Sequence, residues 1–381
     1  MKNQITRRQL LKGSVAFAAL ALAQRPLSAF GLAEPAAGEQ VVPFLDQQPA
    51  GKMLRWQQLT QWLTPTTDVF AVSHYGVPTV DLNHWSLEVA GLVRSPATFT
   101  LGQLKARKRK TVIATLECSG NGSDPTFMGA IGNVRWTGTP LGPLLKECGL
   151  LARGSEIVFF GADEKVEKIR DREYSQNFAR SLARADALRD DVLLAWEMNG
   201  QPLTTEHGAP LRLIVPGWFG IAWVKWLTRL EVLDRRYMSK YMAREYVTIR
   251  GEEHAGRTIW RETSVGPIDV KSITARVVRR PDGTLRVSGA AWTDGTPLKA
   301  VELKIDDSAW LPVELDRTNQ AKHAWTFWHF DWKNAPAGEH KLVSRAIDAE
   351  GRVQPAADDP AIRLKRTYWE ANQQHPRTIK L

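Results

Sequence analysis

The sequence predicts an α+β domain followed by an antiparallel β-sandwich of the immunoglobulin-like (Ig-like) kind. Three observations support this fold class. From residue 40 to 265, short strand-like runs are mixed with helix-like segments, without a repeated βαβ alternation. From residue 268 onward, apolar and polar residues alternate in several runs separated by tight turns. About 350 residues remain once an N-terminal leader is set aside, which is the length of two ordinary domains.

The first 33 residues are typical of an export signal and carry no weight in the fold prediction. The segment from Thr6 to Lys12, TRRQLLK, has the twin-arginine pattern, and an apolar run too short to span a bilayer follows it. Five of the cations behind the formal net charge of +10 lie in this leader. We expect export by the twin-arginine machinery, removal of residues 1–33 and a periplasmic mature protein.

Residues 40–265 are expected to form the mixed domain. Short β-branched or aromatic runs predict strands at 112–114, 157–160 and 211–215, and apolar spacing predicts helices over 141–148 and 176–188. The basic run 105–110 is typical of a solvated helix end before a strand. A nucleic-acid patch is the alternative, but an exported protein seldom meets nucleic acid.

Residues 268–381 are expected to form the sandwich domain. Pro-Asp-Gly, Asp-Gly-Thr-Pro and Pro-Ala-Gly turns separate the alternating runs, as between antiparallel strands. The predicted strands are 272–278, 284–292, 300–306, 325–332 and 340–348. The hinge between the two domains is expected near Val265-Gly266-Pro267.

The chain contains two cysteines, Cys118 and Cys148, and an exported protein could join them in a disulfide. Their settings argue against it. Cys148 ends a helix with an apolar face, where a buried free cysteine is common. Cys118 follows a strand and enters the Gly-rich turn Ser119 to Gly122, a suitable place for a metal ligand or a nucleophile. No zinc or covalent-haem spacing is present, so a soft metal with other ligands from a cofactor suits this thiol.

Several segments around Cys118 resemble the sulfite oxidase family of molybdenum oxidoreductases. They are TLECSGN (115–121), IGNVRW (131–136), LLAWEMNGQPL (193–203) and HGAPLRLIVPGWFG with VKW (207–226). The predicted sandwich is similar to the family's C-terminal dimerisation domain. The resemblance therefore covers nearly all of the mature chain and implies a molybdopterin-binding catalytic domain followed by that sandwich.

The resemblance also implies a cofactor and the residues around it. Cys118 would bind molybdenum beside one pyranopterin, with no haem in this chain, and Tyr246 would point its phenol at the metal's oxo group. Arg212, Lys225 and His207 would hold the cofactor phosphate, for which charged and N–H donors are suited. The positions that match the remaining pterin contacts are Phe70, His74, Asp163 and Val224, the last within VKW.

The sequence departs from the family at three anion-binding arginines. Val72-Ser73-His74 replaces Arg-Asn-His, Gly122-Ser123 replaces the arginine after the Cys118 turn, and Ala222 replaces a third. Trp218, Phe219 and Trp223 are expected near the same place, and an apolar wall favours a less charged substrate. Lys365 or Arg366 is expected to compensate by folding back from the C-terminus.

Two enzymatic functions and one non-enzymatic function are compatible with these residues. The first is oxidation of sulfite or a related sulfur compound by oxygen-atom transfer. The alternative is reduction of an uncharged S-oxide or N-oxide, which the missing arginines favour. A metal-free binding module would have little use for Cys118. For the oxidase we expect a separate electron acceptor, a c-type cytochrome or a membrane haem subunit, and a homodimer through the sandwich.

Overall fold

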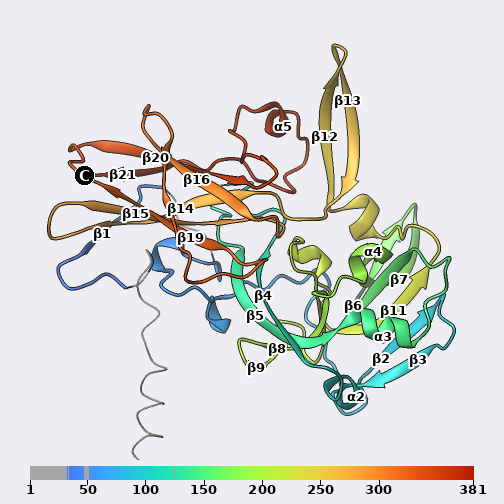
Figure 1. Cartoon of the computed structure of the whole chain (residues 1–381). Helices are drawn as coiled ribbons and strands as arrows, with labels where there is room; N and C mark the ends of the chain where they lie inside the picture. The colour runs from blue at the N-terminus through green and yellow to red at the C-terminus, as the bar shows by residue number, and fades with distance from the viewer. Residues whose placement is uncertain (1–31, 33, 47–50, 125) are drawn as a thin grey trace, which may run out of the picture.

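The computed structural model describes residue 32 and residues 34–46, 51–124 and 126–381 (Figure 1). Strands dominate and helices are short, which agrees with the α+β class in its coarse form. The predicted leader lies outside the described residues except for Leu32. Leu32 is fully buried, and its carbonyl oxygen accepts a hydrogen bond from Arg276 Nη1 at 3.3 Å.

The sheet that carries Cys118 is antiparallel throughout. Its strands in order are β10 (Arg212–Ile214), β8 (Leu193–Met198), β5 (Ile131–Pro140) and β4 (Lys110–Glu117), with β9 (Gln201–Pro202) paired to β8. Three of the predicted elements are confirmed here: the strands at 112–114 and 211–215, and the helix at 141–148, seen as α3 (Leu141–Glu147).

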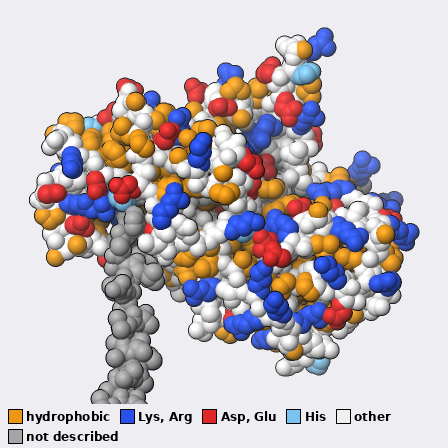
Figure 2. Space-filling model, in the orientation of Figure 1, with side chains coloured by type: hydrophobic (Ala, Val, Ile, Leu, Met, Phe, Trp, Pro, Cys, Tyr) orange, Lys and Arg blue, Asp and Glu red, His pale blue; other side chains and the backbone are white. Residues whose placement is uncertain are grey.

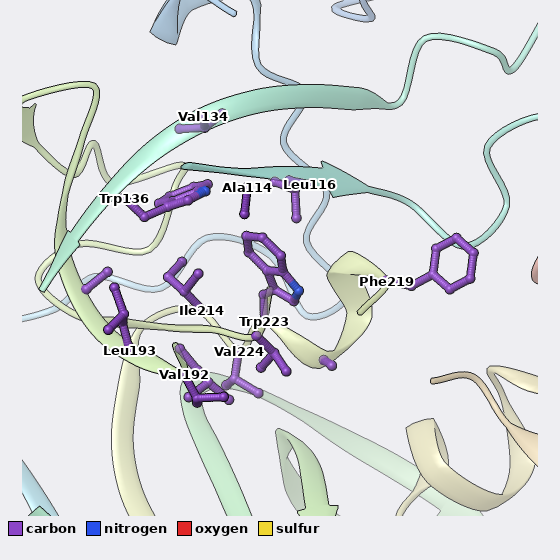
Figure 3. Close-up of a cluster of buried hydrophobic side chains, with 14 of the residues drawn as sticks. Ala114, Leu116, Val134, Trp136, Val192, Leu193, Ile214, Phe219, Trp223 and Val224 are labelled. Atoms are coloured by element: carbon purple, nitrogen blue, oxygen red, sulfur yellow. The ribbon is translucent and has the colours of Figure 1, made fainter. Parts of the chain in front are cut away.

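A cluster of apolar side chains packs against this sheet (Figure 3). Leu116 of β4, Trp136 of β5 and Ile214 of β10 point toward Trp223, which is 1% exposed. Burial of large side chains of this kind is the main favourable term in folding. The cluster therefore fixes the ends of β4 and β10, where Cys118 and Arg212 lie.

A second, mixed sheet lies beside the first in the N-terminal region. Its strands in order are β3 (Ala97–Thr100), β2 (Ser86–Gly91), β11 (Leu227–Leu233), β6 (Glu156–Ile169) and β7 (Arg172–Ala183). Only the β11 and β2 pair is parallel. The short α2 (Leu101–Lys105) has a capping box, in which Thr100 Oγ1 accepts from Gln103 N at 3.2 Å.

The helix predicted over 176–188 is wrong for most of its length. Residues 176–183 belong to β7, which pairs with β6, and only α4 (Arg184–Ala187) is helical. The segment contains good helix formers such as Ala179 and Leu182, but both are buried on the edge strand that pairs with β6. Tertiary pairing therefore overrides local propensity here.

The C-terminal region forms two further antiparallel sheets. One has the order β1 (Gln40–Val42), β14 (Lys271–Arg279), β15 (Leu285–Trp292), β19 (Thr326–Trp332) and β18 (Glu314–Leu315). The other has the order β17 (Leu311–Pro312), β16 (Leu298–Ile305), β20 (Glu339–Asp348) and β21 (Arg377–Lys380). All five predicted strands of this region are present.

Both sheets contribute to one hydrophobic cluster, which includes Val277 and Val287 from the first sheet and Leu303 and Leu342 from the second. Two sheets that share an apolar layer have the arrangement of a sandwich. Its assignment to the immunoglobulin-like type stays a prediction.

A segment near each end of the chain packs against the other region. β1, which falls within the predicted N-terminal domain, pairs with β14 of the C-terminal sheet. After α5 (Pro360–Arg363), the chain returns to the N-terminal region, where Arg366 N donates to Ile249 O at 2.8 Å. The hairpin of β12 (Val247–His254) and β13 (Arg257–Ser264) projects from the body of the molecule at this point (Figure 1).

The remaining helical turns are short, and none of the described helices is long and apolar enough to cross a membrane. They are η1 (Trp56–Gln58), η2 (Thr66–Asp68), η3 (Gly220–Ala222) and η4 (Lys240–Arg244).

The basic run 105–110 spans the end of α2 and the start of β4, as predicted. Acidic side chains accompany it: Arg107 lies 2.5 Å from Glu147, and Lys110 lies 3.1 Å from Asp190. The visible face of the molecule likewise shows basic and acidic side chains interspersed (Figure 2).

Candidate active site

A cavity of about 650 Å³ opens beside the end of β4. Segments far apart in the sequence line it: the loop 70–74, the Cys118 turn, the start of β10 at Arg212, and five residues between Gly220 and Trp226. A second, more open cavity of about 1380 Å³ shares six of these lining residues, including Ser73, Glu206, His207 and Lys225. The two cavities therefore form one cleft that is deep at Cys118 and open at Lys225.

Cys118 lies at the deep end of this cleft. Its backbone N–H donates to Ala130 O at 2.9 Å and its carbonyl oxygen accepts from Asn121 N at 2.9 Å, which closes the turn. Both cysteines are free, as predicted, and Cys148 is buried at the end of α3. Burial raises the pKa of the Cys118 thiol. A cation at the sulfur would therefore favour the thiolate strongly.

Three residues that line the cleft have a buried polar side-chain atom with no hydrogen-bond partner among the described residues. The atoms are Ser119 Oγ, Asp163 Oδ1 and Arg212 Nε. Buried polar groups almost always have partners in folded proteins. A polar ligand in the cleft would offer partners to these side chains.

The cations of the cleft are held by backbone carbonyl groups. Arg212 Nη1 donates to His207 O at 3.0 Å and Nη2 to Trp223 O at 3.3 Å, and Lys225 Nζ donates to Glu206 O at 2.9 Å. Gly208 has φ +100° and packs on Lys225, so a side chain at residue 208 would displace the lysine. These contacts hold both cations in one part of the cleft, and the carbonyl groups do not neutralise their positive charges.

Burial shifts the pKa of four ionisable groups in this part of the cleft. It lowers the pKa of Lys225 to about 7, aided by nearby Arg212, and lowers the pKa of Arg212 to about 9. Burial and the same two cations lower the pKa of His207 to about 4, whereas burial raises the pKa of Asp163 to about 6. An anionic ligand would relieve the desolvated cations.

We expect sulfate to bind the cofactor-free protein less tightly as the pH rises from about 6 to about 8. Asp163 gains a negative charge near pH 6 and Lys225 loses its positive charge near pH 7, so both changes weaken attraction for an anion. Isothermal titration calorimetry measures the affinity, and sulfate itself does not titrate in this range. Lys225→Gln should flatten the upper part of the profile; an affinity that rises with pH contradicts this account.

Tyr246 and His74 form the other wall of the deep end. Tyr246 Oη lies 2.7 Å from His74 Nε2. Burial, with contributions from Lys225, Lys240 and Arg180, lowers the pKa of His74 to about 4, and burial raises the pKa of Tyr246. At neutral pH the pair is therefore an uncharged imidazole and a protonated phenol.

Aromatic rings surround this pair, and the sequence did not single them out. His74 stacks on Phe178 with centroids 5.1 Å apart and lies 4.7 Å from the Tyr241 ring. Tyr246 stacks on Trp369, which comes from the C-terminal segment, at 4.0 Å and 22°. No alternation in β7 marks Phe178, because residues 178–182 are all buried, and no local signal places Trp369 beside a tyrosine more than a hundred residues away.

Seven of the predicted site residues besides Cys118 line the cleft together with it: Phe70, His74, Asp163, His207, Arg212, Lys225 and Tyr246. Val224 does not, because its side chain lies in the apolar cluster of Figure 3 and its carbonyl oxygen accepts from Leu213 N. Of the three aromatic residues expected nearby, only Trp223 lines the cavity; Trp218 and Phe219 do not, and Phe219 lies apart from the other labelled side chains in Figure 3.

The expected replacement for the missing arginines does not occur. The C-terminal segment folds back, but Lys365 Nζ donates to Glu370 O at 3.0 Å and Arg366 stacks over the Trp260 ring at 4.7 Å. Neither residue lines the cleft. Tyr368 and Trp369 of the same segment pack beside the Cys118 turn and Tyr246 instead.

Comparisons with known proteins point to molybdopterin-dependent oxidoreductases. A family profile described as "Oxidoreductase molybdopterin binding domain" matches residues 74–241. Mitochondrial sulfite oxidase of Drosophila melanogaster is 28% identical over 89% of this chain and 62% of its own length. Sulfite oxidase of Gallus gallus is 28% identical over 86% of this chain and 75% of its own length.

Two further similar proteins are named for activities other than sulfite oxidation. Nitrate reductase [NAD(P)H] of Hordeum vulgare is 27% identical over 82% of this chain but only 38% of its own length. The crystal structure of the sulfane dehydrogenase SoxCD from Paracoccus pantotrophus superposes with a TM-score of 0.73 and 28% identity, covering 95% of this chain and 96% of that chain. This chain thus spans less than two thirds of several curated relatives, including the fly enzyme at 62%. The profile, the relatives and the solved structure converge, and together they support assignment of this chain to the sulfite oxidase family of molybdopterin-dependent oxidoreductases.

Proposed function

We propose that this protein is an exported oxidoreductase that oxidises sulfite or a related sulfur compound at a Cys118-bound molybdenum centre. The observation that carries the proposal is the shared cleft. It brings the Cys118 thiol and the Tyr246–His74 pair to one end, and the two cations Arg212 and Lys225, which donate to backbone carbonyl groups, to the other. No single sequence motif predicts that these residues meet in one cleft.

The residues present fit a molybdenum pyranopterin. Cys118 offers a thiolate to the metal, Arg212 Nε and Lys225 offer donors to a phosphate, and Asp163 Oδ1 and Ser119 Oγ are free to bind polar groups of the pterin. When bound, the cofactor supplies oxygen-atom transfer and storage of two electrons. The protein supplies the orientation of that group and the exclusion of water from the deep end of the cleft.

Tyr246 and His74 would act on the substrate's oxygen atoms. A protonated phenol can donate a hydrogen bond to an anion, and a neutral imidazole 2.7 Å away holds that phenol in one orientation. Burial raises the pKa of Tyr246, so it stays protonated through the physiological range. The pair can therefore stabilise negative charge or pass a proton without carrying a charge itself.

The substrate pocket is poor in charge for a sulfite dianion. Val72 and Ser73 line the cleft where the resemblance places an arginine, and Arg180, buried behind Tyr246, donates to the backbone carbonyls of Tyr241 and Val265. A desolvated dianion needs paired charge. We therefore expect a higher KM for sulfite than for a less charged sulfur compound with a group that can lie on the aromatic wall.

The vacant cationic positions also favour a second candidate, reduction of an uncharged S-oxide or N-oxide. Both directions can be assayed on protein shown to contain molybdenum. Reduction of an artificial one-electron acceptor that depends on sulfite or a thio compound supports the oxidase. Oxidation of a reduced viologen dye that depends on dimethyl sulfoxide or trimethylamine N-oxide, without the first activity, supports the reductase.

Export and the electron acceptor belong to the same proposal. The twin-arginine pattern supports export as a folded protein to the periplasm. The SoxCD neighbour supports a complex with a partner subunit. A c-type cytochrome or a membrane haem subunit is the acceptor that we propose, because each accepts one electron at a time.

Replacing Trp369 by leucine should lower kcat/KM for the preferred sulfur substrate by roughly 3 to 10-fold. Trp369 covers one face of Tyr246, and an aromatic pair of this kind contributes about 0.5–1.5 kcal/mol beyond its buried area. Trp369→Phe keeps a ring against Tyr246 and should retain most of the activity. Equal losses in both variants would argue against stacking as the cause.

A further inference from the structure

A buried ion pair lies directly beside the Cys118 turn. Glu117 precedes Cys118 and is fully buried, and Lys271 Nζ lies 2.9 Å from Glu117 Oε1 with its side chain only 2% exposed. The carboxylate also accepts hydrogen bonds from Asn121 Nδ2 at 2.9 Å and from Trp292 Nε1 at 2.7 Å. Buried charges persist only when such partners are complete, and this pair is completely satisfied.

Lys271 connects three separate segments of the chain. It stands on β14 of the C-terminal region, and its ammonium group donates to Glu117, to Asn121 O at 2.5 Å and to Ala371 O at 2.7 Å. These bonds use all three of its protons. The lysine thus binds the Cys118 turn on one side and the C-terminal segment on the other.

The Cys118 turn leaves room for the Lys271 side chain at Gly122. Gly122 has φ +92°, and a Cβ atom there would lie 2.7 Å from Lys271 Nζ. Only glycine meets both conditions without strain or displacement of the ammonium group. The same glycine's carbonyl oxygen accepts from Gln373 Nε2 at 2.6 Å, so the C-terminal segment binds the turn a second time.

The C-terminal segment also carries the aromatic wall of the site. Trp369, which stacks on Tyr246, lies two residues before Ala371, and Glu370 Oε1 accepts from Gly266 N at 3.2 Å. The ammonium group of Lys271 is therefore hydrogen-bonded both to the turn of the sulfur ligand and to the segment that covers Tyr246.

We propose that Lys271 is a positioning residue that lets the C-terminal region set the geometry and the charge at Cys118. It neutralises the one carboxylate adjacent to the thiol in sequence and holds the Cys118 turn at a fixed place relative to Trp369. The proposal rests on the proposed role of Cys118 as the metal ligand. It predicts that a change on β14 alters the metal centre although Lys271 does not line the cleft.

The test compares the holoenzyme with Lys271→Met, using Arg377→Met as the matched control. Arg377 also makes a buried ion pair, 3.0 Å from Asp46, and also donates to the β14 backbone, at Thr274 O. Its contacts do not include the Cys118 turn. Both variants should lower the melting temperature, but only Lys271→Met should change the molybdenum electron paramagnetic resonance spectrum and lower kcat by roughly 10 to 100-fold, the range for partners that orient a metal ligand.

If Lys271→Met does not fold, the double variant Glu117→Gln/Lys271→Met keeps the test decisive. Removing both charges avoids an unpaired buried carboxylate, so the melting temperature should recover, while the spectrum stays altered because the link from Asn121 to Ala371 is still absent. A wild-type spectrum and kcat in either foldable variant overturns the proposal. Retention of the wild-type spectrum by Cys118→Ala would instead overturn the ligand role of Cys118, which separates the two failures.

Discussion

Cys118→Ala should yield a folded protein with no measurable molybdenum-dependent turnover. The thiol lines the deep end of the cleft and makes no disulfide, so its removal costs the fold little. Loss of an outer-shell partner of a metal ligand already costs about 10 to 100-fold in activity, and loss of the ligand itself should exceed that range. Circular dichroism and acceptor reduction with the preferred sulfur substrate measure the two effects separately.

The second cysteine provides the control for this experiment. Cys148 is 2% exposed and packs at the end of α3, so Cys148→Ala should cost about 1 kcal/mol of stability and leave turnover unchanged. Equal activity in the two variants would show that Cys118 does not hold the metal. Equal loss would point to a general requirement for both thiols, which the free state of each does not predict.

Arg212→Gln should weaken retention of the cofactor by roughly 10 to 100-fold. Arg212 lines the cleft and its buried Nε has no partner among the described residues, and a hydrogen bond from a charged group contributes about 1.5–3 kcal/mol. Glutamine lacks the charge and the planar fork that suits a phosphate. The measurement is molybdenum and pterin content per chain after dialysis at increasing ionic strength.

Arg180→Gln is the matched control for Arg212. Arg180 is equally buried and likewise donates to backbone carbonyls, but it does not line the cleft. Its replacement should destabilise the fold while cofactor content in the folded fraction stays near wild type. A loss of cofactor as large as that in Arg212→Gln would mean that general loosening, not phosphate binding, explains both results.

The sequence predicts elements well where tight turns bound a run with a regular apolar period. All five predicted C-terminal strands are present, although only some, such as β16, alternate in burial, whereas β14 and β15 are buried along almost their whole length. The segment 176–188 has no such period, because Phe178 to Leu182 are buried on both faces of β7, and it was mistaken for a helix. The pairing of β1 with β14 joins residues more than 200 positions apart and has no local signal.

The candidate site was predictable where its residues lie in contiguous motifs. Cys118, His207 and Arg212 each stand within a segment that resembles the family, and the fold brings them to one cleft. Trp369 and Lys271 act through contacts between regions that are distant in sequence, and such contacts depend on how the sheets pack. Lys365 and Arg366 were expected on charge alone, but bonds within their own segment and to the β12–β13 hairpin hold them away.

The most direct test of the account is X-ray absorption at the molybdenum edge of the wild-type holoenzyme and of Cys118→Ser. The account predicts one sulfur neighbour of the metal more in the wild type than in the variant, because the pterin supplies the same sulfurs in both. Equal numbers of sulfur neighbours in two molybdenum-replete samples would contradict it and remove Cys118 from the metal centre.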